Sequence, residues 1–216
     1  VPMIDGSRIV GLSNWKWAHE GTFDYPTEDL LPRGPMPAKW MQYHGHYLFE
    51  NQVVLSYSID GRKILEMPSK PKGFGAIVQT LQIEAGNEDL LLQVAKLEKD
   101  NVVQGYLPLL AKEAKLDRAS VKGIAVNMVK DDGAIGRFTA VFAKGGSDES
   151  RLKPGKENAT TLTIPASRKS QTLQVIRFSG KGEGELLAFA SYLTHLQKRK
   201  TLPNLKDKIK GGPARW

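Results

Sequence analysis

An aromatic cluster with one imidazole and one carboxylate lies near the start of the chain, in the pattern Trp-x-Trp-x-His-Glu over residues 15–20. Aromatic rings stack on the apolar faces of sugar rings, and a carboxylate accepts hydrogen bonds from hydroxyl groups, so this cluster could bind carbohydrate. The alternative is that the tryptophans cover the open face of a sheet, because a large aromatic side chain buries about 150–250 Å². The candidate ligand-binding residues are Trp15, Trp17, His19, Glu20, Trp40 and Tyr43.

Two histidines stand two positions apart in the stretch Tyr43-His-Gly-His-Tyr47. If this stretch is extended, His44 and His46 project from one face and could share a metal ion, with a third ligand such as His19 or Glu20. The alternative is a structural or surface role, because the flanking tyrosines suit the packing of a strand. Both alternatives stay open on the sequence alone.

No residue pattern predicts a catalytic centre. Glu20 and Asp24 are candidate paired carboxylates, but a glycosidase needs its two carboxyl groups about 5–10 Å apart, which a sequence does not show. The chain has no Gly-x-Ser-x-Gly motif, and its glycine-rich stretches 73–75 and 180–184 match no phosphate-binding pattern. We therefore assign no catalytic residue. An enzyme that uses these carboxylates, or a histidine–metal site near the aromatic cluster, remains an alternative.

Charge and cysteine content exclude several classes of protein. Lys and Arg number 31 against 23 Asp and Glu, which gives a net charge of +8. The aromatic residues cluster at the front of the chain and the lysines toward its end, which favours a basic solvent-exposed surface over a nucleic-acid site. The absence of cysteine excludes disulfides, thiolate zinc sites and covalent c-type haem. No run of about 18 apolar residues predicts a membrane span.

The elements that position these residues are predicted to be strands. Residues 53–59 alternate apolar and polar side chains, Asp60-Gly61 follows, and residues 62–67 resume the pattern. Two such runs joined by Asp-Gly predict a hairpin with a type I′ turn, because both central residues need positive φ. In the predicted register Tyr57 faces Ile64, and Ile59 faces Arg62.

The rest of the chain predicts more strands and one helix. The further strands are expected at residues 76–84, 90–97, 121–130, 137–144, 160–164 and 172–179, with a second hairpin turn at 131–133. Residues 183–198 place apolar side chains at helical spacing, with Glu183 and Glu185 in the first turn, and predict an amphipathic helix. Residues 107–116 are compatible with a short helix, and residues 145–159 are expected to be a solvent-exposed loop.

These elements predict a mainly β protein, namely an antiparallel β-sandwich of seven or eight short strands with one C-terminal amphipathic helix. Residues 1–50 hold four prolines between positions 26 and 37 and are expected to form an irregular, aromatic-rich lead segment. The sandwich domain is expected to span residues 1–200, and residues 201–216 to link it to a following domain. We expect both ends of the chain to be cut ends of a longer protein.

Several stretches resemble a known family: residues 19–25 (HEGTFDY), 31–40 (LPRGPMPAKW), 43–47 (YHGHY), 53–66 and 210–216 (KGGPARW). They are similar to an uncharacterised domain of large exported bacterial proteins. There the domain precedes a propeller resembling sorbosone and glucose dehydrogenases, often with a cytochrome c module. The resemblance implies an extracytoplasmic location and propeller and cytochrome domains as partners. It places any haem or quinone cofactor in those domains, none in this segment, and supplies no catalytic residue.

The leading hypothesis is a non-catalytic accessory domain of a cytochrome-linked, sugar-dehydrogenase-like protein, which contacts carbohydrate or the propeller. The contact residues would be the eight named candidates: Trp15, Trp17, His19, Glu20, Trp40, Tyr43, His44 and His46. The first alternative is a carbohydrate-active enzyme domain. The second is a structural or assembly module, in which free strand edges pair between subunits.

Overall fold

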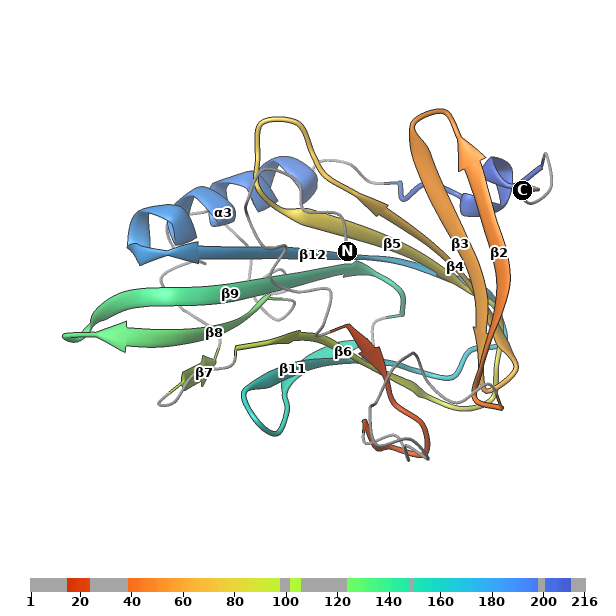
Figure 1. Ribbon diagram of the computed structural model, residues 1–216, viewed down its shortest axis with the longest axis horizontal. Coiled ribbons are helices and arrows are strands. Elements are labelled where there is room, and N and C mark those ends of the chain that lie inside the picture. The colour runs from red at the N-terminus through yellow and green to blue at the C-terminus, as the bar shows by residue number, and fades with distance from the viewer. Residues whose placement is uncertain are drawn as a thin grey trace, which may run out of the picture.

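Two antiparallel sheets form the body of the protein (Figure 1). The computed structural model describes residues 15–23, 39–97, 102–105, 124–147, 150–197 and 201–210. The larger sheet has eight strands, in the spatial order β2 (Met41–Phe49), β3 (Gln52–Ile59), β4 (Arg62–Ser69), β5 (Ile77–Ile83), β12 (Gln171–Lys181), β9 (Ala134–Gly145), β8 (Ile124–Asp131) and β7 (Val102–Gly105). The smaller sheet has the order β1 (Lys16–Trp17), β6 (Leu90–Lys96), β11 (Ala159–Ile164) and β10 (Arg151–Pro154). The predicted mainly β fold and antiparallel sandwich are confirmed.

The register of the first predicted hairpin is confirmed. β3 pairs with β4 so that Tyr57 lies opposite Ile64 and Ile59 lies opposite Arg62. Because side chains alternate along a strand, Tyr57 and Ile59 share one face of the sheet. This face is turned toward the smaller sheet, since both residues belong to the core that includes Leu92 of β6.

The Asp-Gly corners have the backbone conformation that the sequence predicts. Asp60 and Gly61 have φ values of 48° and 77°, and Asp132 and Gly133 have φ values of 49° and 83°. Asp and Gly tolerate this left-handed region better than other residues, so each corner turns the chain within two residues. The second corner joins β8 to β9, as expected.

The main core lies between the two sheets. It contains fully buried aliphatic side chains from both, among them Leu81 and Ile83 of β5, Leu92 of β6 and Leu162 of β11. Burial of one such side chain stabilises the fold by about 1.5–3 kcal/mol. The two sheets are therefore held together by an apolar layer that extends across the central strands.

The predicted C-terminal helix is confirmed as α3 (Gly182–Gln197), with both expected glutamates in its first turn. It packs on the outer face of β12 and β9 (Figure 1), where Phe189 is buried in the same core as Phe138. Glu185 Oε2 accepts a 2.8 Å hydrogen bond from the backbone N–H of Lys181. This bond ties the first turn of the helix to the end of β12. None of the helices in the described ranges is long and apolar enough to cross a membrane.

The number of strands is larger than predicted. The described residues form twelve strands, whereas the sequence predicted seven or eight. The expectation of an irregular segment over residues 1–50 is wrong for β1 and β2, since residues 41–49 pair with β3 across a two-residue turn. The expected loop at 145–159 is wrong over β10, which pairs with β11. The strand β7 was not predicted, and the candidate short helix at 107–116 lies outside the described residues.

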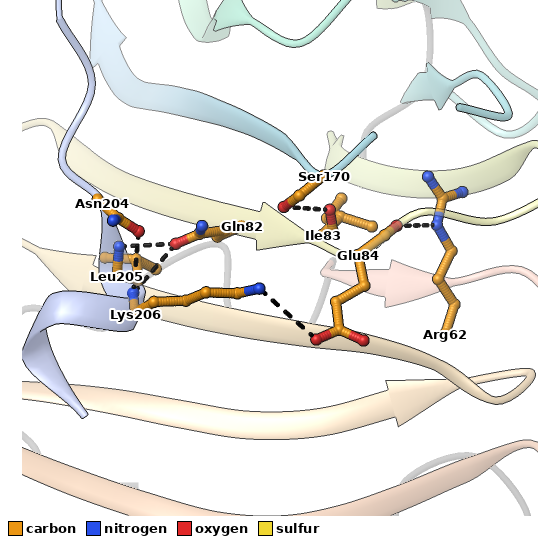
Figure 2. Close-up of polar contacts among 8 residues, drawn as sticks. All are labelled: Arg62, Gln82, Ile83, Glu84, Ser170, Asn204, Leu205 and Lys206. Carbon is orange, nitrogen blue, oxygen red and sulfur yellow. Dashed lines mark hydrogen bonds and ion pairs between the residues drawn. The ribbon is translucent and has the colours of Figure 1, made fainter. Parts of the chain in front are cut away.

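Residues 201–210, assigned to a linker by their composition, pack on the outer face of the larger sheet. A short 3-10 helix, η2 (Leu205–Lys208), buries Leu205 completely against Val54 and Met67. Gln82 Oε1 accepts hydrogen bonds from the backbone N–H groups of Leu205 and Lys206, at 2.7 and 3.2 Å (Figure 2). This segment is therefore a docked part of the fold.

The same end of β5 anchors two other segments (Figure 2). Arg62 Nε donates to the carbonyl of Glu84 at 2.7 Å, and Ser170 Oγ donates to the carbonyl of Ile83 at 3.0 Å. The Lys206 ammonium lies 3.9 Å from the Glu84 carboxylate. The end of β5 thus joins the β4 hairpin, the start of β12 and η2.

Leu205→Ala tests whether the docked segment stabilises the fold. We expect the free energy of unfolding to fall by about 2–5 kcal/mol, because the substitution leaves a cavity beside Val54 and Met67. Denaturant unfolding measures the loss. The control is Lys206→Ala, which removes only a surface ion pair and should cost under about 1 kcal/mol. Equal stability of both variants would contradict the docking.

Candidate functional site

Five side chains form a continuous line of hydrogen bonds between the sheets, which we call the buried polar chain. Trp17 Nε1 donates to the Tyr57 hydroxyl at 3.1 Å, and that hydroxyl donates to Glu66 Oε2 at 2.6 Å. Gln79 Nε2 donates to Glu66 Oε1 at 2.7 Å, and Arg177 Nη2 donates to Gln79 Oε1 at 2.5 Å. Each of these residues is at most 7% exposed. The Gln79 amide therefore bridges a buried carboxylate and a buried guanidinium.

Strand order explains how this chain assembles. Its last four residues come from β3, β4, β5 and β12, which are consecutive neighbours in the larger sheet. Arg177 Nη1 also donates to the carbonyl of Val94 in β6, at 3.2 Å, so the chain connects the two sheets. Trp17 adds a second connection, because it belongs to β1 of the smaller sheet. Sequence reasoning missed this cluster, although Glu66 occupies an inward position of the predicted hairpin.

Burial changes the acid–base properties of the chain. It raises the pKa of the Glu66 carboxyl above its usual value, although hydrogen bonds from Tyr57 and Gln79 and the charge of Arg177 oppose this rise. The Trp15 indole also acts to lower this pKa, without a hydrogen bond of good geometry. Burial lowers the pKa of Arg177 to about 10, against the favourable charge of Glu66, and raises the pKa of Tyr57 well above its usual value.

The two front tryptophans have packing positions. Trp17 is 5% exposed and belongs to the main core, so its ring is not presented at the surface. Trp15 is half-buried against the same core, and the Arg177 guanidinium lies 4.9 Å from its ring centroid. A cation over an aromatic face is stabilised by the ring quadrupole. Trp15 thus covers the buried polar chain.

A second group gathers at the surface, and we call it the His19 cluster: His19, Glu20, Trp40 and Asp60. His19 Nδ1 lies 2.8 Å from Asp60 Oδ1, and the imidazole stacks on the Trp40 ring with a centroid distance of 3.8 Å and an angle of 21°. Glu20 Oε1 lies 3.7 Å from His19 Nε2. Since a carboxylate oxygen only accepts, His19 donates from Nδ1, and its Nε2 faces the Glu20 side.

Two tight turns hold the His19 cluster together. His19 and Thr22 exchange two backbone hydrogen bonds, at 2.9 and 3.0 Å, around Glu20 and Gly21, whose φ values are 49° and 77°. Asp60 belongs to the corner between β3 and β4, and its N–H donates to the carbonyl of Trp40 at 2.9 Å. Three of the predicted ligand-binding residues, His19, Glu20 and Trp40, are therefore brought together, and Asp60 was missed. Asp24 lies outside the described residues.

His44 and His46 each contact a different residue, Ser58 and Tyr43 respectively. A β-bulge between Tyr43 and Gly45 inserts His44 as an extra residue. His44 Nε2 lies 3.1 Å from Ser58 Oγ, and His46 Nδ1 lies 2.8 Å from the hydroxyl of Tyr43, which is 58% exposed. Within the described part of the chain no group of three or more His, Asp or Glu side chains is placed to hold a metal ion.

The two groups differ in what they can do chemically. The buried polar chain is closed between the sheets and ties them together. The His19 cluster offers an imidazole stacked on an indole, flanked by the Asp60 and Glu20 carboxylates, with Glu20 mostly exposed at 85%. Carboxylate oxygens and imidazole nitrogens form hydrogen bonds to hydroxyl groups of a ligand.

Comparison with known families and structures gives limited matches. Residues 1–66, out of 216, match a family described as a domain of unknown function (DUF6797). No curated protein matches the sequence.

Two similar solved structures are of the GH36 α-galactosidase AgaA from Geobacillus stearothermophilus. The A355E form with 1-deoxygalactonojirimycin is 9% identical, with a TM-score of 0.40, over 90% of this chain and 33% of that chain. The A355E D478A form with stachyose is 9% identical, with a TM-score of 0.39, over 78% of this chain and 32% of that chain. The chain thus spans about a third of their length, and a likeness at these TM-scores carries no argument about function.

Glu66→Gln tests the state of the buried carboxyl. Because the pKa of Glu66 is raised by folding, its contribution to stability is full below the usual value of about 4.5 and is lost as pH rises through the raised pKa. The native chain should therefore lose stability relative to the variant as pH rises over that range. Denaturant unfolding at a series of pH values measures this difference.

Tyr57→Phe provides the second arm of this experiment. It keeps the carboxyl but removes the hydroxyl that donates to it, so the pKa of Glu66 should rise further and the loss of stability should extend to higher pH. Parallel pH profiles for the native chain and Glu66→Gln would contradict the assignment of a shifted carboxyl.

Proposed function

We propose that this β-domain is a non-catalytic binding module that contacts carbohydrate through the His19 cluster. The observation that carries the proposal is the convergence of His19, Trp40 and Asp60 from three separate segments, with the stacked rings at 3.8 Å and the His19–Asp60 contact at 2.8 Å. The rings of His19 and Trp40 cover each other, so the groups that the cluster turns toward hydroxyls of a sugar are the Asp60 and Glu20 carboxylates and His19 Nε2. The fixed geometry lowers the entropic cost of binding.

The orientation of His19 adds to the proposal. Asp60 holds the imidazole from Nδ1, which leaves Nε2 at the side where Glu20 lies, 3.7 Å away. Imidazole nitrogen and carboxylate oxygen can both take part in hydrogen bonds to hydroxyl groups. A ligand hydroxyl bound between them would be oriented by groups that the turn at 19–22 and the corner at 60–61 already fix.

The resemblance described above extends this proposal to the context of the module. On that resemblance we place the domain next to a sugar-dehydrogenase-like propeller in an extracytoplasmic protein, with any haem or quinone in the neighbouring domains. The complete reading frame that encodes this chain tests the placement. A frame without a propeller or cytochrome module would contradict it and would leave the binding role untouched.

Asp60→Asn tests the binding role with little change to the backbone, because Asn tolerates the left-handed conformation of this corner. We expect the affinity for neutral hexose oligosaccharides to fall about tenfold or more, since a hydrogen bond to a charged group contributes about 1.5–3 kcal/mol. Titration calorimetry, with glucose- and galactose-based oligosaccharides as probes, measures the change.

The matched control is Asp132→Asn, which makes the same substitution in the same kind of corner, at φ 49° instead of 48°, at the far end of the larger sheet. It should bind as the native chain does. Equal affinity of all three proteins, or no binding by the native chain, would contradict the carbohydrate role. Release of reducing sugar by the native chain would contradict a non-catalytic role.

A further inference from the structure

Arg62 is a buried cation that lies just outside the His19 cluster. It follows the Asp60-Gly61 corner directly and is 7% exposed, on the inner face of β4. Its guanidinium donates from Nε to the carbonyl of Glu84 at 2.7 Å (Figure 2), and from Nη1 to the carbonyl of Glu88 at 3.1 Å. One rigid, planar group thus holds two points of the connection between β5 and β6.

This connection packs closely against the guanidinium at Gly86. A Cβ placed on Gly86 would lie 2.8 Å from Cδ and 2.9 Å from Nε of Arg62. The φ of Gly86 is not in the left-handed region, so glycine is needed here for space and not for backbone conformation. Gly86 also exchanges two backbone hydrogen bonds with Ser167, both at 2.9 Å, which fix its position beside the guanidinium.

The charge of Arg62 is partly compensated by an acidic neighbour. Burial lowers the pKa of Arg62, and the charge of Asp89 opposes this shift. Without the guanidinium, the carbonyls of Glu84 and Glu88 would lose their side-chain donor. Because a buried acceptor without a partner is costly, the connection would then have to open to water or move. The side chain of Arg62 therefore determines where this connection lies.

The connection leads back to the His19 cluster through β6. Leu91 lies three residues after Glu88 in the chain. Its carbonyl accepts a 2.8 Å hydrogen bond from the backbone N–H of Ala18, the residue before His19. The turn that carries His19 is therefore attached to the same strand whose start Arg62 holds.

We propose that Arg62 is a positioning residue of the His19 cluster, which sets the distance between the corner that carries Asp60 and the strand that holds the His19 turn. Asp60 stands two residues before Arg62 in a tight corner, so a shift of Arg62 moves the Asp60 carboxylate. That carboxylate lies 2.8 Å from His19 Nδ1, and this contact determines which imidazole nitrogen carries the proton. Arg62 thus acts on His19 Nε2 through Asp60.

Gly86→Ala tests the positioning role without changing Arg62 or the cluster. The new Cβ should displace the guanidinium, because it would lie 2.8 and 2.9 Å from two of the side-chain atoms of Arg62. Proton–nitrogen correlation NMR of the neutral imidazole should show the proton of His19 on Nδ1 in the native chain and a mixture of both tautomers in the variant. The native tautomer in Gly86→Ala, or no preference for Nδ1 in the native chain, would overturn the proposal.

Three further variants complete this measurement. The matched control is Gly105→Ala, which adds the same methyl group on β7, at the other edge of the larger sheet, where nothing lies within 4 Å. It should keep the native tautomer. Arg62→Met should give the same mixture of tautomers as Gly86→Ala, and Arg62→Lys, which keeps a cation for one of the two carbonyls, should lie between Arg62→Met and the native chain. A change in Gly105→Ala, or none in Arg62→Met, would overturn the proposal.

Sugar binding separates this proposal from the binding role, on which only its importance for affinity rests. With the oligosaccharides used above, affinity should fall about tenfold in Asp60→Asn and in Gly86→Ala, and no further in the double variant, because both changes act on one contact. Fully additive losses would overturn the positioning role. If the native chain binds no sugar, the proposed function fails, while the tautomer of His19 still decides the role of Arg62.

Discussion

The packing of the two sheets depends on the two hydrogen bonds that the Tyr57 hydroxyl makes. This hydroxyl accepts a hydrogen bond from Trp17 and donates one to Glu66, so that it joins the first strand of the smaller sheet to the centre of the larger one. A carboxylate buried without partners is costly, and Glu66 is satisfied only because Tyr57 and Gln79 reach both of its oxygens. The sandwich is thus joined by a directional polar link as well as by its apolar layer.

This link has a consequence for the candidate binding surface. Trp17 is fixed by Tyr57, and two residues later His19 reaches Asp60, which follows the same strand as Tyr57. The turn that carries Glu20 is therefore held at two points on β3 and its corner. Proposed ligand contacts placed on such a fixed turn lose little conformational entropy on binding. The buried polar chain and the His19 cluster therefore hold the same turn, one through Tyr57 of β3 and the other through Asp60 at the end of β3.

Local patterns predicted the parts of the fold that local interactions determine. The alternation at 53–59 and the Asp-Gly corner fix the pairing of Tyr57 with Ile64, because a two-residue turn leaves one register. The strand β10 escaped prediction because Arg151-Leu-Lys-Pro154 has one apolar residue and is held by its neighbour β11. The bulge at His44 has a local signal in Gly45, since an isolated glycine within a strand is typical of a bulge, but the prediction did not use it. The contact of His19 with Asp60 and the link from Gln79 to Arg177 join residues 41 and 98 positions apart, so only the folded sheet brings them together.

Hydrogen exchange at the backbone N–H of Ala18 tests the central link most directly. This group donates to the carbonyl of Leu91 at 2.8 Å and lies between Trp17 and His19, so its exchange reports how firmly β1 is held. In the Tyr57→Phe variant, exchange at Ala18 should become faster relative to amides in β9. Unchanged protection of Ala18 in that variant would show that packing alone holds β1, and would contradict the role of the Tyr57 hydroxyl in joining the sheets.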